Sequence, residues 1–424
     1  MSDRRSPNTA LTDAAPWGPD MEIRTKEAIG VMLAYCMLSA FGVAVGRALW
    51  PEPIGLGGLL NFDADHYRAI AEDGYVGFRM AFFPLFPLIW RISGLDAVGI
   101  TVLNAFFFLG SALLLAKELR VSWASFIAWL VVPGTIFYFL PYSEATFFVG
   151  ATTLLIGVRR GSILWGIAGI MVCSLSRPAF AVLLPAVAIA VLFRHGPTRR
   201  ALIECTVYAL TAVAGLALVS FIQYQDTGDW MGYISQQKGW GNSLRLPAFP
   251  LTSWGGAAST RLDAVAFLVG VASGVDLLAR IRARIVKGTS TDPVLALSLA
   301  YISGISLLVL LFRGGELFSL NRFVFACPFF LVVINHHIVS KRSFKAERIV
   351  MVFLMILAGF LVFGSYVHIQ TFLAYALIAA YLTFCLVIPG MSKHRGPAFW
   401  VWASITFVIQ VFFYLRFTSG GWVA

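Results

Sequence analysis

The sequence predicts an all-α polytopic membrane protein, and three observations lead to that fold class. Hydrophobic residues make up 59% of the 424 residues, charged residues make up only 12%, and the mean hydropathy is +0.80. Soluble domains carry roughly 25% charged residues. Apolar runs of about 17 to 25 residues, the length that a helix needs to cross a hydrocarbon core, recur along the chain. They leave no room for a separate soluble domain.

The amino-terminal residues predict a tail followed by a retained helix. Residues 1–25 are polar and proline-containing, so we expect a disordered cytoplasmic tail. The first apolar run, 29–49, is too long for a signal-peptide core and lacks a small-residue cleavage site. We expect residues 26–424 to form a single transmembrane domain.

Basic clusters between the apolar runs predict the orientation. By the positive-inside rule, loops such as "RIRARIVK" (280–287) and "KRSFKAER" (341–348) are cytoplasmic. The net charge of +11 is then explained by the basic cytoplasmic loops of a membrane protein. We therefore expect no nucleic acid as a partner. The amino terminus is then inside and the carboxyl terminus outside. The predicted thirteen or so spans are 29–49, 97–116, 121–140, 144–158, 162–176, 178–193, 201–224, 263–280, 293–312, 323–339, 348–367, 369–390 and 397–416.

The same assignment predicts two large extracytoplasmic loops, 51–95 and 225–262. Placing 51–95 outside requires the proline-interrupted segment 82–93 not to span. The runs 144–158 and 162–176, like 178–193, are short for a crossing, so we expect broken or buried helices beside a cavity. Every unusual polar motif falls on this outer side. A transporter would instead place charges at mid-membrane depth on repeated helices, and no convincing internal repeat is found.

The motif "FDADHY" gathers Asp63, Asp65, His66 and Tyr67 just after the first apolar run. A partly desolvated carboxylate can act as a general base toward a hydroxyl. The alternative is that these are solvated loop acids. If residues 64–72 form a helix opened by an Asp cap, the segment has one polar side that faces a cavity.

Three further charged residues stand at the outer ends of apolar runs. Arg177 in "SRP" and Arg322 in "SLNR" have no acidic partner in their own motifs, and a guanidinium suits a lipid-linked phosphate. Arginines that snorkel at the interface are the alternative. Glu144 in "PYSE" is either a site residue or an acid that favours a helix amino terminus.

The second outer loop carries Gln236, Gln237, Lys238 and Trp240. Amide groups beside a flat aromatic ring are typical of a surface that grips a sugar. An aromatic-belt loop anchored at the interface is the alternative. Hydroxyl activation, a phosphate contact and a sugar surface on one outer face together indicate glycosyl transfer from a lipid-phosphate donor.

Six motifs follow one another in a fixed order: "FDADHYRAIAEDGY", "FFPLFPL", "PYSEATFF", "SRP", "QYQDTGDW…QQKGWG" and "SLNRF". Over roughly 29–340, this series resembles the GPI mannosyltransferase II (PIG-V) family and its bacterial relatives in the GT-C superfamily. The resemblance implies an inverting mannosyltransferase that uses polyprenyl-phosphate mannose. Asp63 matches the family's acid and is expected to be the catalytic base. Arg177 and Arg322 match the family's arginines and are expected at the donor phosphate or in the site's architecture. Phe62, where the family usually has Trp, puts the sugar specificity in question.

We therefore expect transfer of mannose to a hydroxyl on an extracytoplasmic glycolipid, glycan or protein, in a prokaryotic plasma membrane. No cofactor is required. A divalent metal bound by the D-x-D pair is not expected, because no third ligand is evident in the sequence. The alternatives are a transferase of another lipid-linked sugar, such as arabinose or glucose, and a lipid transporter or flippase.

Overall fold

The computed structural model describes residues 22–49, 56–254, 256–339, 345–364, 368–391 and 396–423. Within these ranges, the regular structure is helical, and extended segments pair only in isolated bridges, Glu22 with Ser122 and Thr252 with Glu316. The helical class predicted from composition is confirmed. Nearly all of the expected tail, 1–25, lies outside the described residues, as does the beginning of the first loop, 51–55.

In the described part of the chain, nine helical segments are long and apolar enough to cross a membrane. A helix satisfies its own backbone polar groups, which is why apolar runs in lipid form helices. The nine are α1 (Thr25–Leu49), α4 (Ala97–Leu119), η5 with α8 (Pro178–Val182 and Leu183–His195), α9 (Arg199–Thr227), most of α11 (Ala257–Lys287), α12 (Pro293–Phe312), α15 with η6 (Ala346–Gly359 and Phe360–Phe363), α16 (Ile369–Met391) and α17 (Pro397–Thr418).

Shorter helices occupy the middle of the bundle. η4 (Pro133–Phe139) and α6 (Glu144–Arg160) meet at a bend of 108°, and counting this broken pair as one span raises the number in the described residues to ten. α5 (Trp123–Val131), α7 (Ile163–Ser176) and α14 (Pro328–Val339) are shorter still. α6 is buried along almost its whole length. The expected count of thirteen stays a prediction. The run 178–193 corresponds to η5 and most of α8, which together are long enough to span.

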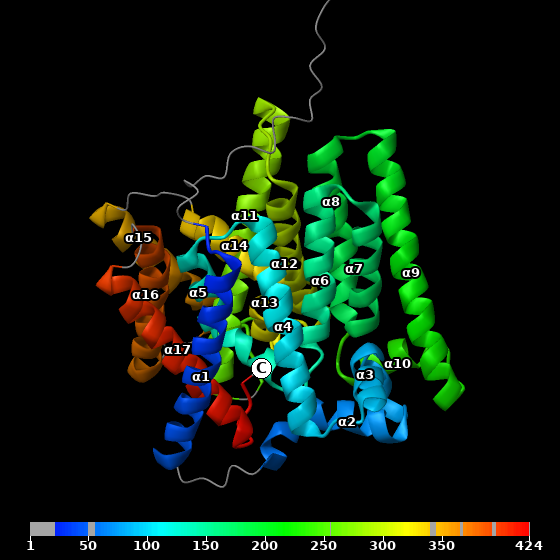
Figure 1. Ribbon diagram of the computed structural model, residues 1–424. Coiled ribbons are helices and arrows are strands. Elements are labelled where there is room, and N and C mark those ends of the chain that lie inside the picture. The colour runs from blue at the N-terminus through cyan, green and yellow to red at the C-terminus, as the bar shows by residue number, and fades with distance from the viewer. Residues whose placement is uncertain are drawn as a thin grey trace, which may run out of the picture.

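One end of the bundle, which we call the basic end, gathers the carboxyl ends of α4, α6, α8 and α11 (Figure 1). Arg160 on α6 pairs with Glu118 on α4, and Arg284 on α11 donates to the carbonyl of Phe193 on α8. Arg194 lies 3.9 Å from Glu204, which links α8 to α9. Loops predicted to share the cytoplasmic side therefore lie together in space.

The opposite end, which we call the site end, carries the short helices α2 (Asp63–Asp73), α3 (Leu85–Ser93) and α10 (Gly232–Gly239) (Figure 1). Pro84 immediately precedes α3 and Pro87 lies in its first turn, where a missing N–H breaks no helical hydrogen bond. With nine residues, α3 is too short to cross a membrane. The site end also includes η2 (Leu56–Leu60) and η3 (Gly77–Ala81).

Candidate active site

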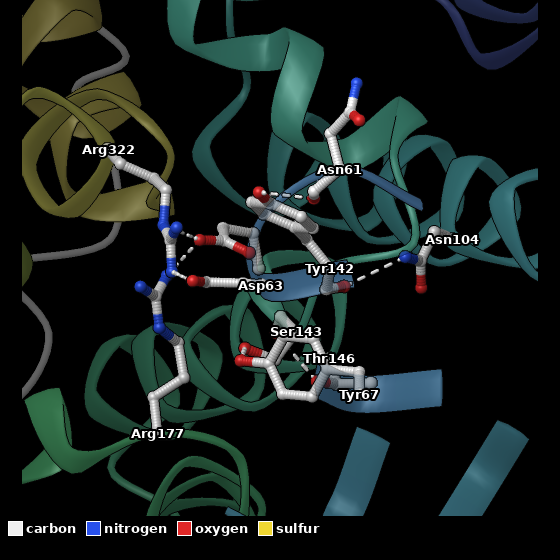
Figure 2. Close-up of polar contacts among 10 residues, drawn as sticks. Asn61, Asp63, Tyr67, Asn104, Tyr142, Ser143, Thr146, Arg177 and Arg322 are labelled. Carbon is white, nitrogen blue, oxygen red and sulfur yellow. Dashed lines mark hydrogen bonds and ion pairs between the residues drawn. The ribbon is translucent and has the colours of Figure 1, made fainter. Parts of the chain in front are cut away.

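Asp63 is the first residue of α2. The preceding Phe62 adopts a positive φ of 57°, and no side chain caps the helix, so the expected Asp cap is wrong. Instead, the Phe62 ring packs edge-on against Phe417 and Trp422 from the carboxyl-terminal segment, with centroid distances of 5.7 and 4.7 Å. These contacts fix the sharp turn after which the Asp63 carboxylate points into the bundle (Figure 2).

Glu144 is the first residue of α6 and is fully buried. The turn before it is held by Asn104 of α4, whose Nδ2 donates to the carbonyls of Leu140 and Tyr142 at 2.7 and 2.9 Å. The Tyr67 hydroxyl lies 2.6 Å from the Ser143 Oγ and connects α2 to the same turn (Figure 2). The two acidic motifs, 81 positions apart along the sequence, thus lie side by side.

Arg322, on α13 (Leu320–Phe325), joins both carboxylates. Its Nη2 lies 2.6 Å from Asp63 Oδ2 (Figure 2). Its Nε lies 2.5 Å from Glu144 Oε1. Arg177, at the end of α7, reaches the same Glu144 oxygen through Nη1 at 2.7 Å. We call Asp63, Glu144, Arg177 and Arg322 the ion network.

Burial requires this pairing, because a buried charge without a partner is strongly destabilising. The side chains of Glu144, Arg177 and Arg322 are 0%, 5% and 6% exposed, and that of Asp63 is 15% exposed. Burial alone would lower the pKa of Arg322, but Glu144 and Asp63 more than offset it and raise that pKa. Asp63 is therefore the more accessible of the two carboxylates in the ion network.

Sequence reasoning missed the residues that position α13. Asp263, fully buried on α11, accepts hydrogen bonds from the backbone N and the Nδ2 of Asn321, both at 2.8 Å. The Ser253 hydroxyl donates to its other oxygen at 2.5 Å. Asn321 directly precedes Arg322, so Asp263 fixes the helix that carries this arginine. A carboxylate at the first position of an apolar run was the available signal.

Asp65 and His66 contact other residues than those of the ion network. Asp65 is exposed and pairs with Arg68 one turn along α2. His66 packs against Phe78, Phe82 and Trp240, with ring centroids 5.2, 5.2 and 6.3 Å away. Burial lowers the pKa of His66, although the charges of Asp63 and Asp65 act in the opposite direction.

The residues predicted to grip a sugar lie on or next to α10, over η3. Gln237 donates to the carbonyl of Ala81 at 3.3 Å and accepts from Asn242 at 2.6 Å. Gln236 is half-buried, and Trp240 is exposed beside the ring of His66. Three aromatic rings and one imidazole therefore form a surface one helical turn from Asp63.

The described residues contain no group of three His, Cys, Asp or Glu side chains arranged to hold a metal ion. Asp63 Oδ2 is engaged by Arg322, and Asp65 faces Arg68. The two carboxylates of the D-x-D pair therefore face two different arginines.

Comparison with known proteins shows a partial similarity. Over 115 residues, the chain is 34% identical to the GPI mannosyltransferase 2 of Drosophila melanogaster. The match covers 22% of this chain and spans about a quarter (25%) of the length of that relative. No protein-family profile matches the chain.

Proposed function

We propose that the protein is an integral-membrane inverting mannosyltransferase, similar to the PIG-V enzymes of the GT-C superfamily. It transfers mannose from polyprenyl-phosphate mannose to a hydroxyl of a glycolipid, glycan or protein. The observation that carries the proposal is the ion network, which presents one partly exposed carboxylate, Asp63, at the site end of a helical membrane bundle. The partial similarity to a GPI mannosyltransferase supports the choice of sugar.

Asp63 is the general base in this mechanism. Arg322 holds Oδ2, which leaves Oδ1 to accept the proton of an acceptor hydroxyl. As the hydroxyl oxygen forms a bond to C1 of the sugar, the bond from C1 to the phosphate oxygen breaks. The polyprenyl phosphate leaves with that electron pair, and the configuration at C1 inverts. A phosphate leaves without protonation by an acid, so one carboxylate suffices.

The site end is the extracytoplasmic end in this proposal. The basic end collects the Lys- and Arg-rich loops, which the positive-inside rule assigns to the cytoplasm. A donor used on the outer face must arrive attached to a membrane lipid. The surface of His66, Phe78 and Trp240 beside Asp63 suits the acceptor sugar, because aromatic rings pack against sugar faces.

The test is transfer of labelled mannose from polyprenyl-phosphate mannose by the purified protein in nanodiscs, with polyprenyl-phosphate arabinose and glucose as parallel donors. Asp63→Asn keeps the shape of the side chain but removes the base, and we expect transfer to fall by roughly 10²- to 10⁴-fold. Asp65→Asn is the matched control on the same helix. Normal turnover by Asp63→Asn would exclude Asp63 as the base. Faster transfer from the arabinose or glucose donor would show that the donor sugar is not mannose.

A further inference from the structure

The ion network leaves the donor phosphate without a counterion. The formal charges of Asp63, Glu144, Arg177 and Arg322 cancel, and both arginines face Glu144. A sugar phosphate attached to a lipid carries a negative charge, and an anion that leaves water needs a paired cation. The cation must therefore come from outside the network.

Arg313, the residue that follows α12, is a half-buried guanidinium fixed on two sides. Its Nε donates to Asn242 Oδ1 at 3.0 Å, and its Nη1 donates to the carbonyl of Phe318. Among the described residues, no carboxylate forms an ion pair with it, and its Nη2 has no hydrogen-bond partner. Desolvation lowers the pKa of Arg313, but a guanidinium remains charged at neutral pH.

Arg245 lies against the turn that follows Arg313. A Cβ at Gly314 would come within 3.3 Å of Arg245 Nε, and this glycine has a φ of +60°. The backbone of the Arg245 segment runs along the end of α12, where Arg245 N donates to the carbonyl of Leu311 and Ala248 N to that of Gly314. Arg245 is exposed, and its Nη2 donates to the carbonyl of Gly241. In the part of the chain that the structure describes, two guanidiniums with which no carboxylate forms an ion pair thus lie at one turn.

The surface around this turn is apolar and exposed. Leu244 is 72% exposed, Leu246 is 90% exposed and Phe249 is 70% exposed, while Phe312 at the end of α12 is 40% exposed. Arginines flanked by exposed apolar side chains are typical of a segment at headgroup depth. The charges of Asp263, of Asp63 and of the exposed Glu316 act on Arg313, that of Asp263 most strongly, but among the described residues none of the three forms an ion pair with it.

We propose that Arg245 and Arg313 form the binding site for the phosphate of a polyprenyl phosphate, with Leu244, Leu246 and Phe249 against its first isoprene units. This inference rests on the proposed function, since that function supplies the lipid donor. Arg322 and Arg177 then orient Asp63 and Glu144. The second pair of arginines, Arg245 and Arg313, contacts the phosphate. Guanidiniums are suited to this contact because their N–H groups match phosphate oxygens.

Direct binding of polyprenyl phosphate to the protein in nanodiscs, without any sugar, tests the proposal. We expect Arg313→Gln and Arg245→Gln each to raise the Kd by roughly 10-fold, since hydrogen bonds between charged groups are about twice as strong as neutral ones. The lysine variants at both positions should bind with intermediate affinity. Arg47→Gln, an exposed arginine in the last turn of α1, is the matched control and should bind as the wild type. Polyprenol, which lacks the phosphate, and phosphatidylglycerol are the competing lipids.

The outcomes separate this inference from the proposed function. The Arg245 side chain is exposed, so Arg245→Gln leaves the packed core unchanged. Unchanged binding by this variant together with unchanged binding by Arg313→Lys would overturn the phosphate site even if mannose transfer were established. Equal competition by phosphatidylglycerol would overturn the polyprenyl specificity. If binding depends on both arginines while no mannose is transferred, the phosphate site stands and the proposed reaction falls.

Discussion

The fully buried carboxylate of Glu144 forms an ion pair with Arg322, whose Nε lies 2.5 Å from Glu144 Oε1. The sequence left open whether Glu144 is a site residue or an acid at a helix amino terminus. Glu144 has both positions, because it lies in the first turn of α6 and also in the ion network. One carboxylate thereby ties the "PYSE", "SRP" and "SLNR" motifs into a single structure.

Removing the charge of Glu144 is expected to destabilise the fold. Glu144→Gln leaves Arg177 and Arg322 close together with a single counterion, Asp63, and breaking a buried ion pair costs about 3–5 kcal/mol. Unfolding of the detergent-solubilised protein in a denaturant titration measures this change. The surface pair of Asp65 and Arg68 is the control, because exposed pairs contribute only about 0–1 kcal/mol. Equal stability of Glu144→Gln and Asp65→Asn would contradict the importance of the network.

Lysine cannot replace Arg322 in the network. The guanidinium reaches Asp63 through Nη2 and Glu144 through Nε, whereas an ammonium is a single point charge. We expect Arg322→Lys to leave the protein folded and to lower kcat by about 10²-fold, the cost of a misplaced catalytic group. Steady-state transfer kinetics measure it, with Arg68→Lys as the control. A kcat equal to that of the wild type would show that Arg322 does not orient the base.

Asp263 is expected to act through Arg322 as a positioning residue. Asp263→Leu removes the acceptor for both Asn321 groups, so α13 loses the contact that fixes its first turn. Asp263→Asn retains an oxygen for those bonds, and we expect it to keep most of the activity. Transfer kinetics should show a lower kcat with little change in KM for Asp263→Leu. If the asparagine and leucine variants are equally impaired, the charge of Asp263, and not its hydrogen bonds, is the important property.

His66 is expected to make stability depend on pH. Because burial lowers its pKa in the folded state, the unfolded chain binds a proton more readily, and stability falls as the pH drops through about 6.5 toward the folded pKa. Arg79 lowers this pKa further, while Asp63 and Asp65 oppose the shift. Melting temperatures of the wild type and His66→Asn between pH 7.5 and 5.5, compared in the same buffers, measure the effect. The variant should lose less stability on acidification, and parallel curves would contradict this.

The composition and hydropathy of the chain were sufficient for its helical class, because apolar runs in lipid have few structural options. The charge pattern likewise placed the basic loops on one side, and the contacts between α4, α6, α8 and α11 agree with it. Periodicity could not fix which short helices cross the bundle. α6 is bent sharply from η4 and α3 is confined to the site end, and both depend on packing between distant segments.

The motifs named Asp63, Glu144, Arg177 and Arg322 separately, since ionisable residues are conspicuous at the ends of apolar runs. Their pairing was not visible, because each partner lies in a different motif far along the chain. Asp263 escaped notice for the same reason, as its partner Asn321 is 58 positions away. Local patterns report which groups are costly to bury in a membrane protein. Only the folded chain shows how those costs are offset, because a counterion is chosen by distance in space.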